Sequence, residues 1–463
     1  MVQSLKDFSH PYFIGVAGTG MSAIAQYLQG IGMQVAGSDR AFSSASGLET
    51  KLTLERAGIQ CHVQDGSGLH AAIDVVVVST AIEPTVPEVV MAKERGIPIL
   101  HRAALLAMIA ASKKTIAVAG TSGKSTTAAM LFDMLEQGGL SPSIISGAGL
   151  TRIIQQGKIG NAVVGHGDWL VIEADESDGS IVNYHPEIGL LLNIDKDHDE
   201  VAVLMGLFEQ FQKNSKRFSV NRTHPLAASL STAIKNDFLV ATAASSTSTN
   251  VGYQASGFQQ KGMSITFSIN QIPFTAKQVG QHNMENALAA TAVANQIGVS
   301  LESCATALAH YQGIYRRHQL LGQKNGVWVI DDYAHNPAKC AAAITACYPV
   351  ASKIIAWFQP HGYKPTRFLR DDFVSSIASA LRPTDEIWMS EIYYAGGTAV
   401  KDISAGDLIN DLQNRGVQAF FVEDRAAWVD AVRPHLTNDC VVLLMGARDP
   451  SLENFAQQVF QSL

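Results

Sequence analysis

A short glycine loop at residues 120–125 carries the clearest chemical signal in the chain. The segment IAVAGTSGKSTT at 116–127 runs from an apolar stretch into Gly120 and Gly123, and Lys124 and Ser125 follow directly. Glycines let backbone N–H groups close on phosphate oxygens, and the start of the following helix favours an anion. Lys124 can neutralise phosphates and the Ser125 hydroxyl can ligate Mg²⁺, although Val118 breaks the common GxxxxGK[ST] spacing. The loop predicts phosphate binding, with an ordinary strand–helix turn as the alternative.

A second glycine loop lies near the N-terminus. Gly15, Gly18 and Gly20 follow the apolar stretch YFI, and the pattern GxGxxA counted from Gly18 ends at Ala23. Asp39 follows the next apolar stretch, where dinucleotide-binding folds place an acidic residue on a ribose. This fingerprint favours an NAD-dependent dehydrogenase; a site for another nucleotide and a plain strand–helix turn are the alternatives. A dehydrogenase leaves the loop at 120–125 without a role.

Acidic, amide and imidazole side chains follow two further apolar stretches, WLVI and GLLL. They are Glu173, Asp175, Glu176, Asp178, Asn193, Asp195, Asp197 and His198. Open α/β sheets place ligands at the carboxyl ends of strands, and carboxylates there suit Mg²⁺ shared with phosphates. A solvated loop, or a structural histidine, is the alternative for each group alone. Two such clusters in a chain with a phosphate loop favour a metal site.

Three later groups of polar residues open a helix or stand between predicted elements. They are His282, Asn283 and Asn286, then Arg316 and Arg317, then Asp331, Asp332 and His335. Polar side chains at a helix start often serve as caps, and charges between elements are often only solvated. Nucleotide contact is the functional interpretation, and the residues alone leave both open.

Apolar strands that alternate with helices must position these groups. Strands are predicted at 12–18, 33–39, 75–80, 115–120, 169–175, 188–194, 326–334, 353–358, 386–392, 419–424 and 440–446. Helices are predicted at 21–32, 102–111 and 285–298. A small antiparallel β segment is predicted at 262–269, and a surface loop at 241–250. This alternation is typical of parallel sheets covered on both faces. We therefore predict an α/β protein with three doubly wound domains in series, at 1–110, 111–313 and 314–463.

The composition excludes several classes of function. The 463 residues include 34 Lys and Arg against 41 Asp and Glu, without the basic patch of nucleic-acid-binding proteins. The five cysteines have no CxxC spacing, which indicates reduced thiols and no metal–thiolate site. No apolar run approaches the roughly 18 residues of a membrane span, and the N-terminus lacks a signal-peptide core. We expect a cytoplasmic enzyme, a monomer or weak dimer, with small-molecule substrates and no nucleic-acid or membrane partner.

Taken in order, these segments resemble the Mur ligase family of ATP-dependent amide-forming ligases, most closely its alanine-adding branch. The resemblance is carried by GVAGTGMSAIA (15–25), AVAGTSGKSTT (117–127), IEADESDGS (172–180), NIDKDH (193–198), GQHNMENALAA (280–290), DDYAHNP (331–337) and FQPHGYKPTR (358–367). It implies a Rossmann-like UDP-binding domain, a central P-loop-type ATPase domain and a C-terminal Rossmann-like domain. It also implies that ATP converts the lactyl carboxylate of UDP-N-acetylmuramate into an acyl phosphate, which an amine attacks, in peptidoglycan precursor synthesis.

The resemblance implies roles for residues in all three domains. It places the UDP part of the substrate at Gly15, Gly18, Thr19, Gly20, Met21, Ser22, Asp39, Ser79 and Ile82. It places ATP at Gly120, Thr121, Ser122, Gly123, Lys124, Ser125, Thr126, His282, Asn283, Asn286, Arg317 and Asp332. Mg²⁺ would be held by Ser125, Glu173 and His198, and the catalytic residues would be Lys124, Glu173, His198 and His335.

The chain departs from the family pattern at three places. Ser122 replaces a histidine of the loop, and Ser215 stands where several members carry a carbamylated lysine. Gly362 and Pro365 stand where the alanine-adding branch has arginines, whose planar two-pronged clamp a lysine does not copy. The residues left to bind the amino acid are His361, Lys364 and Arg367.

The resemblance favours L-alanine as the amine and leaves other functions open. The ligase would use a different amino acid, or a peptide as in recycling, if the altered segment after FQPH changes the amine. A non-catalytic nucleotide-binding paralogue is a further alternative to the ligase, beside the dehydrogenase.

Overall fold

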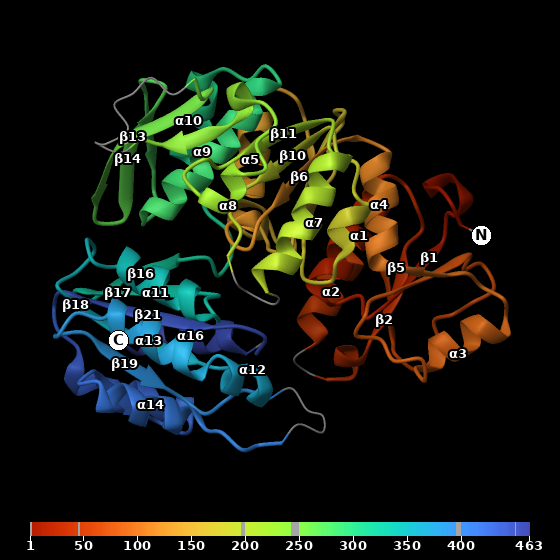
Figure 1. Cartoon of the computed structure of the whole chain (residues 1–463). Helices are drawn as coiled ribbons and strands as arrows, with labels where there is room; N and C mark the ends of the chain where they lie inside the picture. Colours follow the sequence, from red (N-terminus) through yellow and green to blue (C-terminus); the bar gives the residue numbers. More distant parts are fainter. Residues whose placement is uncertain (1, 45–46, 196–199, 242–249, 395–399, 450) are drawn as a thin grey trace. The chain divides into compact units, whose positions relative to one another are not determined.

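The computed structural model describes residues 2–44, 47–195, 200–241, 250–394, 400–449 and 451–463, which form two compact units (Figure 1). The first unit comprises Met1–Gly257, Phe267–Ala276 and Met284–Ile314. The second comprises Phe258–Thr266, Lys277–Asn283 and Tyr315–Leu463. Both are built from helices packed on mainly parallel sheets, so the predicted α/β class is confirmed.

The first sheet is parallel throughout, with strand order β3-β2-β1-β4-β5. Alternate residues of β1 face different cores: Phe13 packs with α1, α2 and α4, whereas Tyr12 and Ile14 pack with α3. The order reverses beside β1, and such a switch point is where open α/β sheets bind ligands. Its elements are β1 (Pro11–Ile14), α1 (Thr19–Gly30), β2 (Ala36–Asp39), α2 (Leu48–Arg56), β3 (Gln60–Val63), β4 (Val75–Val78), α3 (Pro87–Glu94), β5 (Ile99–His101) and α4 (Arg102–Ala111).

The second sheet has the order β11-β10-β6-β9-β7-β8 and is parallel except for the edge strand β8. It shares one apolar core with the first sheet, since Phe13 of β1 and Phe208 and Phe211 of α7 belong to the same cluster. Its elements are β6 (Lys114–Ala119), α5 (Lys124–Gln137), β7 (Ser143–Ile145), α6 (Thr151–Ile154), β8 (Ala162–Val163), β9 (Trp169–Ala174), β10 (Ile188–Leu191), α7 (Val201–Asn214), β11 (Arg217–Val220) and α8 (Pro225–Ala228).

A smaller sheet follows, with the order β12-β13-β14-β15. Only Gly262 and Met263 join β13 to its neighbour β14, and strands joined by two residues pair antiparallel, as predicted for 262–269. Most of the tract at 241–250, predicted as a surface loop, lies outside the described residues. The elements are β12 (Phe238–Val240), β13 (Tyr253–Lys261), β14 (Ser264–Ile269), β15 (Ile272–Ala276), α9 (Gln281–Gln296) and α10 (Leu301–His310).

The last sheet lies in the second unit and has the order β16-β17-β21-β18-β19-β20. Alternate residues of β18 enter two cores: Ile354 and Phe358 pack with α11, α13 and α14, and Ile355 and Trp357 with α15 and α16. Only β16 runs antiparallel to its neighbour. The elements are β16 (Gln319–Lys324), β17 (Val327–Asp332), α11 (Pro337–Ala346), β18 (Lys353–Gln359), α12 (Tyr363–Phe368), α13 (Arg370–Ala380), β19 (Glu386–Met389), α14 (Ala405–Asn414), β20 (Gln418–Phe421), α15 (Arg425–Val432), β21 (Cys440–Gly446) and α16 (Leu452–Ser462).

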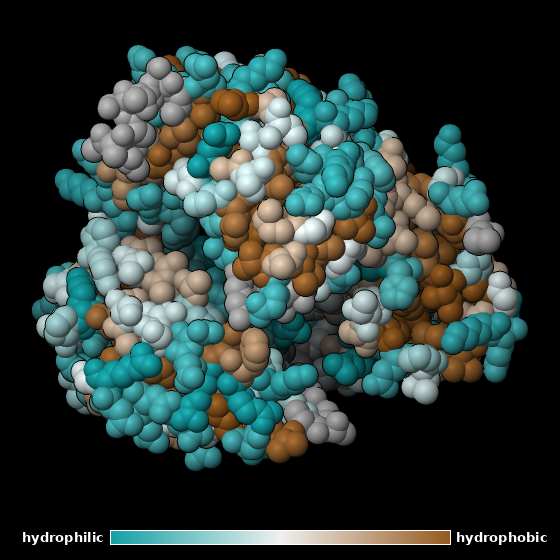
Figure 2. Space-filling model, viewed as in Figure 1, coloured by the Kyte–Doolittle hydropathy of each residue, from teal (hydrophilic) through white to brown (hydrophobic). Residues whose placement is uncertain are grey.

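The visible surface is mostly hydrophilic, with apolar residues showing between the polar ones (Figure 2). Val203 on α7, 54% exposed, is one of the large apolar side chains that face solvent. All five cysteines are free thiols, in agreement with the absence of disulfide spacing in the sequence. Within the described ranges, every helix is too short or too polar to cross a membrane.

Candidate functional site

The loop between β6 and α5 lies at the carboxyl edge of the second sheet. Gly120 and Gly123 have φ angles of 132° and 86°, which side chains on L-residues rarely adopt. A Cβ on Gly120 would lie 3.1 Å from the backbone nitrogen of Asn193, and one on Gly123 would lie 2.5 Å from Oδ1 of Asn286. Both glycines are therefore required by the close approach of neighbouring segments as well as by the turn.

Asn193, which the sequence analysis groups with a predicted metal-binding cluster, instead holds this loop in place. Its Oδ1 accepts hydrogen bonds from Thr121 Oγ1 and from the Ser122 backbone nitrogen, both at 2.9 Å, and its Nδ2 donates to Ser122 O at 3.1 Å. Because Asn193 follows β10, the order β10-β6 brings it beside the loop. Ser122 joins this network through its backbone, so the replacement of a histidine there leaves the loop's shape intact.

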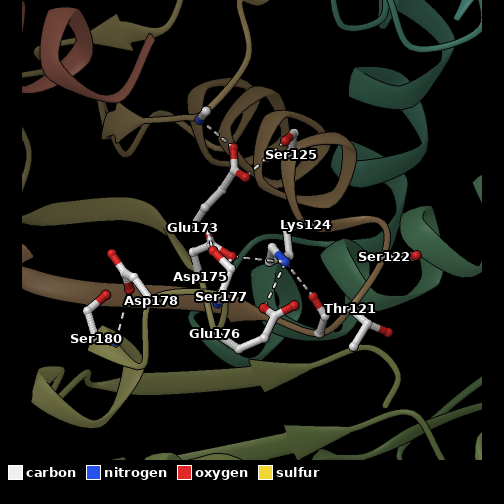
Figure 3. Close-up of polar contacts among 12 residues, drawn as sticks. Thr121, Ser122, Lys124, Ser125, Glu173, Asp175, Glu176, Ser177, Asp178 and Ser180 are labelled. Atoms are coloured by element: carbon white, nitrogen blue, oxygen red, sulfur yellow. Dashed lines mark hydrogen bonds and ion pairs between the residues drawn. The ribbon is translucent and has the colours of Figure 1, made fainter. Parts of the chain in front are cut away.

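Lys124 points back into the loop and toward acidic residues after β9 (Figure 3). Its Nζ donates to Gly120 O and to Glu176 Oε2, each at 2.8 Å, and lies 3.6 Å from Asp175 Oδ1. Burial opposes the charged form, but Glu176 and then Asp175 outweigh it and raise the pKa of Lys124. The ammonium is therefore charged and fixed at the mouth of the phosphate loop.

Glu173, on β9, lies within hydrogen-bonding distance of Ser125, the second residue of α5 (Figure 3). Its Oε2 accepts a hydrogen bond from Ser125 Oγ at 2.9 Å, and its Oε1 accepts from Ser146 Oγ at 2.7 Å and from the Gly147 nitrogen at 2.6 Å. A hydroxyl and a carboxylate oxygen so close together are oxygen donors of the kind Mg²⁺ shares with phosphates.

The third predicted metal ligand, His198, lies outside the described residues. Within the residues that are described, no group of three or more His, Cys, Asp or Glu side chains is arranged to hold a metal ion. Ser125 and Glu173 therefore fit Mg²⁺ only as partial ligands, completed by phosphate oxygens, water or residues beyond the described ranges.

A pocket of about 500 Å³ opens at the switch point of the first sheet. It is lined by six residues predicted to meet the UDP part of the substrate, namely Gly15, Gly18, Met21, Asp39, Ser79 and Ile82. Asp39 also shapes the wall, because its carboxylate accepts hydrogen bonds from the Ala17 and Ala41 nitrogens at 3.0 and 2.9 Å. The pocket size suits a nucleoside-sized ligand.

Thr19, Gly20 and Ser22 do not line that pocket, and two residues that the sequence left unassigned explain why. Ser22 is buried and Asn161 Nδ2 donates to its Oγ at 2.9 Å and to Thr19 O at 2.8 Å. A Cβ on Gly20 would lie 2.8 Å from a guanidinium nitrogen of Arg102, which pairs with Asp178 at 3.1 Å. These contacts tie the second glycine loop, at residues 15–20, to the second sheet.

In the second unit, aromatic rings follow β17 and β18, and Arg317 precedes β16. The guanidinium of Arg317 lies 4.9 Å from the centroid of the Tyr333 ring, and the rings of His335 and His361 are 5.7 Å apart. Burial lowers the pKa of His335 to about 3, so the imidazole is neutral. Its Nδ1 donates to Tyr333 O at 2.8 Å, which leaves the lone pair on Nε2.

The Asp332 carboxylate accepts hydrogen bonds from backbone nitrogens next to these side chains. Its Oδ1 accepts from the Ala334 nitrogen at 2.7 Å and its Oδ2 from the His318 nitrogen at 2.6 Å. Burial opposes its charge, yet His318 and then Arg317 hold the pKa of Asp332 below its usual value. The carboxylate therefore fixes the segment that carries Tyr333 and His335.

The remaining predicted residues occupy separate places. In the first unit, Thr126 lies in the first turn of α5, and Asn286 Oδ1 accepts a hydrogen bond from Thr127 Oγ1 at 3.2 Å beneath the glycine loop. In the second unit, Asn283 donates to Val279 O at 2.8 Å, and His282 packs against Gly280. Arg367 pairs with Asp402, and Lys364 is exposed on α12.

Comparisons with known proteins match most of the chain. Residues 10–114 match the Mur ligase family, catalytic domain; 118–294 match the Mur ligase middle domain; and 316–448 match the Mur ligase, glutamate ligase domain. The UDP-N-acetylmuramate–L-alanine ligase of Pelotomaculum thermopropionicum is 34% identical over 457 residues, 95% of either chain. The enzyme of that name from Caulobacter vibrioides is 32% identical over 466 residues, 96% of this chain and 95% of the other.

Solved structures show the same fold. The UDP-N-acetylmuramate–alanine ligase of Thermotoga maritima superposes with a TM-score of 0.79 at 23% identity over 98% of both chains. A murein peptide ligase from Psychrobacter arcticus gives a TM-score of 0.66 at 22% identity over the same share of both chains. The resemblance drawn from the sequence motifs is confirmed.

Proposed function

The chain belongs to the Mur ligase family, and from this premise we propose that it joins L-alanine to the lactyl carboxylate of UDP-N-acetylmuramate. The reaction consumes ATP, releases ADP and phosphate, and supplies a peptidoglycan precursor. The observation that carries the proposal is the phosphate loop with Lys124, Ser125 and Glu173 converging at its mouth, in a chain that matches alanine ligases from end to end. Binding of the UDP part to the pocket of the first sheet accounts for the second glycine loop.

Different residues of the loop and of β9 have different roles in the first chemical step. Backbone N–H groups of the loop and the Lys124 ammonium hold the phosphates of ATP while a lactyl carboxylate oxygen attacks the γ-phosphorus and ADP leaves. Ser125 and Glu173 would hold Mg²⁺, which supplies positive charge to the transferring phosphoryl group when bound. The product is an acyl phosphate, which must be kept from water.

The second step joins the amine. Its nitrogen attacks the acyl carbon, the tetrahedral intermediate expels phosphate, and an amide remains. His335 is neutral, and its Nε2 offers a hydrogen-bond acceptor to the N–H of an attacking amine. Tyr333 and Arg317 pack beside it, and Asp332 fixes the segment through backbone hydrogen bonds.

The proposal includes finer expectations for the protein's surroundings. Mg²⁺ is the expected metal because its ligands would be a hydroxyl and a carboxylate oxygen. We expect the enzyme to act in the cytoplasm as a monomer or weak dimer. The dehydrogenase alternative is dropped, because the family match at 10–114 includes the second glycine loop and the matches at 118–294 and 316–448 account for most of the remaining chain.

A panel of amines tests the function. The purified chain is incubated with ATP, Mg²⁺ and UDP-N-acetylmuramate, together with single amino acids or a tripeptide released from peptidoglycan, and phosphate release is followed. L-Alanine is expected to give the highest kcat/KM. Faster turnover with a peptide indicates a recycling ligase, and ATP binding without turnover for any amine indicates a non-catalytic paralogue.

A further inference from the structure

We propose that Lys401 receives the carboxylate of the amine substrate, in place of the arginines expected at positions 362 and 365. The inference rests on the proposed ligase function and extends it to the chemical class of the amine. It assigns that substrate as an amino acid or short peptide with a free carboxylate, bound through a single ammonium held over two tyrosine rings.

The proposed subsite lies where β18 and β19 end, beside each other in the sheet of the second unit. The segments after these strands are joined by backbone hydrogen bonds, from Gly362 N to Tyr393 O and from Tyr393 N to Pro360 O, each 2.8 Å. Carboxyl ends of neighbouring parallel strands are where open sheets bind ligands. His361 connects this place to His335, whose ring is 5.7 Å away.

Lys401 is held over two aromatic rings at this edge. Its Nζ lies 5.9 Å from the ring centroid of Tyr363 and 5.7 Å from that of Tyr394, and these rings contact each other at 5.4 Å. An ammonium over aromatic faces is attracted by their electron-rich surfaces, which restricts its position while its outer side faces solvent. Lys401 is exposed. The rings therefore orient the cation without neutralising it.

The segment that follows Lys401 is anchored to its neighbours. Asp402 pairs with Arg367 of α12, and Ser404 Oγ donates to Glu391 Oε2 at 2.6 Å. These bonds tie the start of α14 to the segments that follow β18 and β19. The position of Lys401 is thereby fixed by its neighbours in the chain as well as by the rings.

Other arginines at this end of the unit are already neutralised. Arg367 forms an ion pair with Asp402, and Arg425 forms one with Asp449. Arg370 Nε lies 2.7 Å from Asp411 Oδ2. In the described part of the chain Lys401 forms no ion pair, so its charge is available to a ligand.

The reaction leaves one anion for this cation. The ATP phosphates, and the lactyl carboxylate that attacks them, belong to the loop with Lys124, and the UDP part belongs to the pocket of the first sheet. The carboxylate of the amino acid is the remaining anionic group that must be recognised near His335. A lysine ammonium makes a point-charge contact, whereas arginine forms a two-pronged clamp. We therefore expect recognition of a carboxylate with less demand on its orientation.

The test measures steady-state kinetics of Lys401→Met and Lys401→Arg with L-alanine and with L-alaninamide, which lacks the carboxylate charge. Loss of one charge-assisted contact is expected to raise the KM for L-alanine about 10- to 100-fold in Lys401→Met, with kcat within about twofold. The KM values for ATP and UDP-N-acetylmuramate should stay unchanged, and the preference for L-alanine over L-alaninamide should collapse. Lys401→Arg should retain most of that preference.

Lys261→Met, at an exposed lysine at the end of β13 in the same unit, is the control and should behave as the unaltered chain. A further variant, Lys364→Met, tests whether the exposed lysine of α12 binds the carboxylate instead of Lys401. The inference is overturned if Lys401→Met keeps the original KM for L-alanine, or if Lys364→Met alone removes the preference for a carboxylate. Absence of turnover with every amine in the unaltered chain overturns the proposed function, and this inference with it.

Discussion

Replacing Lys124 with alanine is expected to lower kcat for ligation by roughly 10³-fold while UDP-N-acetylmuramate binds as before. The reason is the position of its ammonium, 2.8 Å from both Gly120 O and Glu176 Oε2 at the mouth of the phosphate loop. The variant loses the one loop side chain that places positive charge on the transferring phosphoryl group. The sugar nucleotide is unaffected because its proposed pocket belongs to the first sheet.

Phosphate release and calorimetric titration with the sugar nucleotide measure the two effects separately. Lys114→Ala is the matched control, since Lys114 lies on β6, has a side chain that is 57% exposed, and pairs with the exposed Asp168. A Lys124→Ala variant that no longer binds the sugar nucleotide, but still binds ATP, would show that the two glycine loops have been assigned to the wrong ligands.

Replacing Glu173 with glutamine is expected to lower kcat by about 10²- to 10³-fold and to raise the Mg²⁺ concentration needed for half-maximal rate by about tenfold. Glu173 is the described carboxylate that meets a hydroxyl of the phosphate loop, with Oε2 2.9 Å from Ser125 Oγ. Glutamine keeps the shape but removes the negative charge that a divalent cation requires. It also presents an amide where Ser146 and Gly147 donate hydrogen bonds, so some loss of stability accompanies the change.

Thermal unfolding and a magnesium titration of the rate distinguish these two effects. Asp168→Asn, at a carboxylate with its side chain 76% exposed, is the control and should alter neither measurement. A Glu173→Gln variant with a lower Tm but an unchanged magnesium requirement would make Glu173 a structural residue and contradict its role as a metal ligand.

The sequence predicts the sheets well where the strands are buried on both faces. β4 reads VVVV and β21 reads CVVLLMG, and every residue of both is buried. β16, with the sequence QLLGQK, was not predicted because it is an antiparallel edge strand whose polar residues face solvent. The loop at 120–125 was recognisable because its function depends on local backbone and adjacent residues.

The residues whose structural roles the sequence does not reveal act across long separations along the chain. Asn193 holds Thr121 and Ser122 from another strand end, and Arg102 reaches Gly20 and Asp178. Spacing along the chain gives no sign of such contacts, because strand order brings the partners together. For the same reason Ser22, predicted to meet the substrate, instead receives a hydrogen bond from Asn161, 139 residues away.

The central claim is that the phosphate held by the loop at 120–125 passes to a carboxylate, and isotope transfer tests it most directly. UDP-N-acetylmuramate labelled with ¹⁸O in both lactyl carboxylate oxygens is turned over with ATP and L-alanine, and the released phosphate is analysed by mass spectrometry. An acyl phosphate route predicts one ¹⁸O atom in each phosphate and the other in the amide carbonyl. Unlabelled phosphate, which indicates attack by water on ATP, or label in AMP, which indicates an adenylate, would contradict the account.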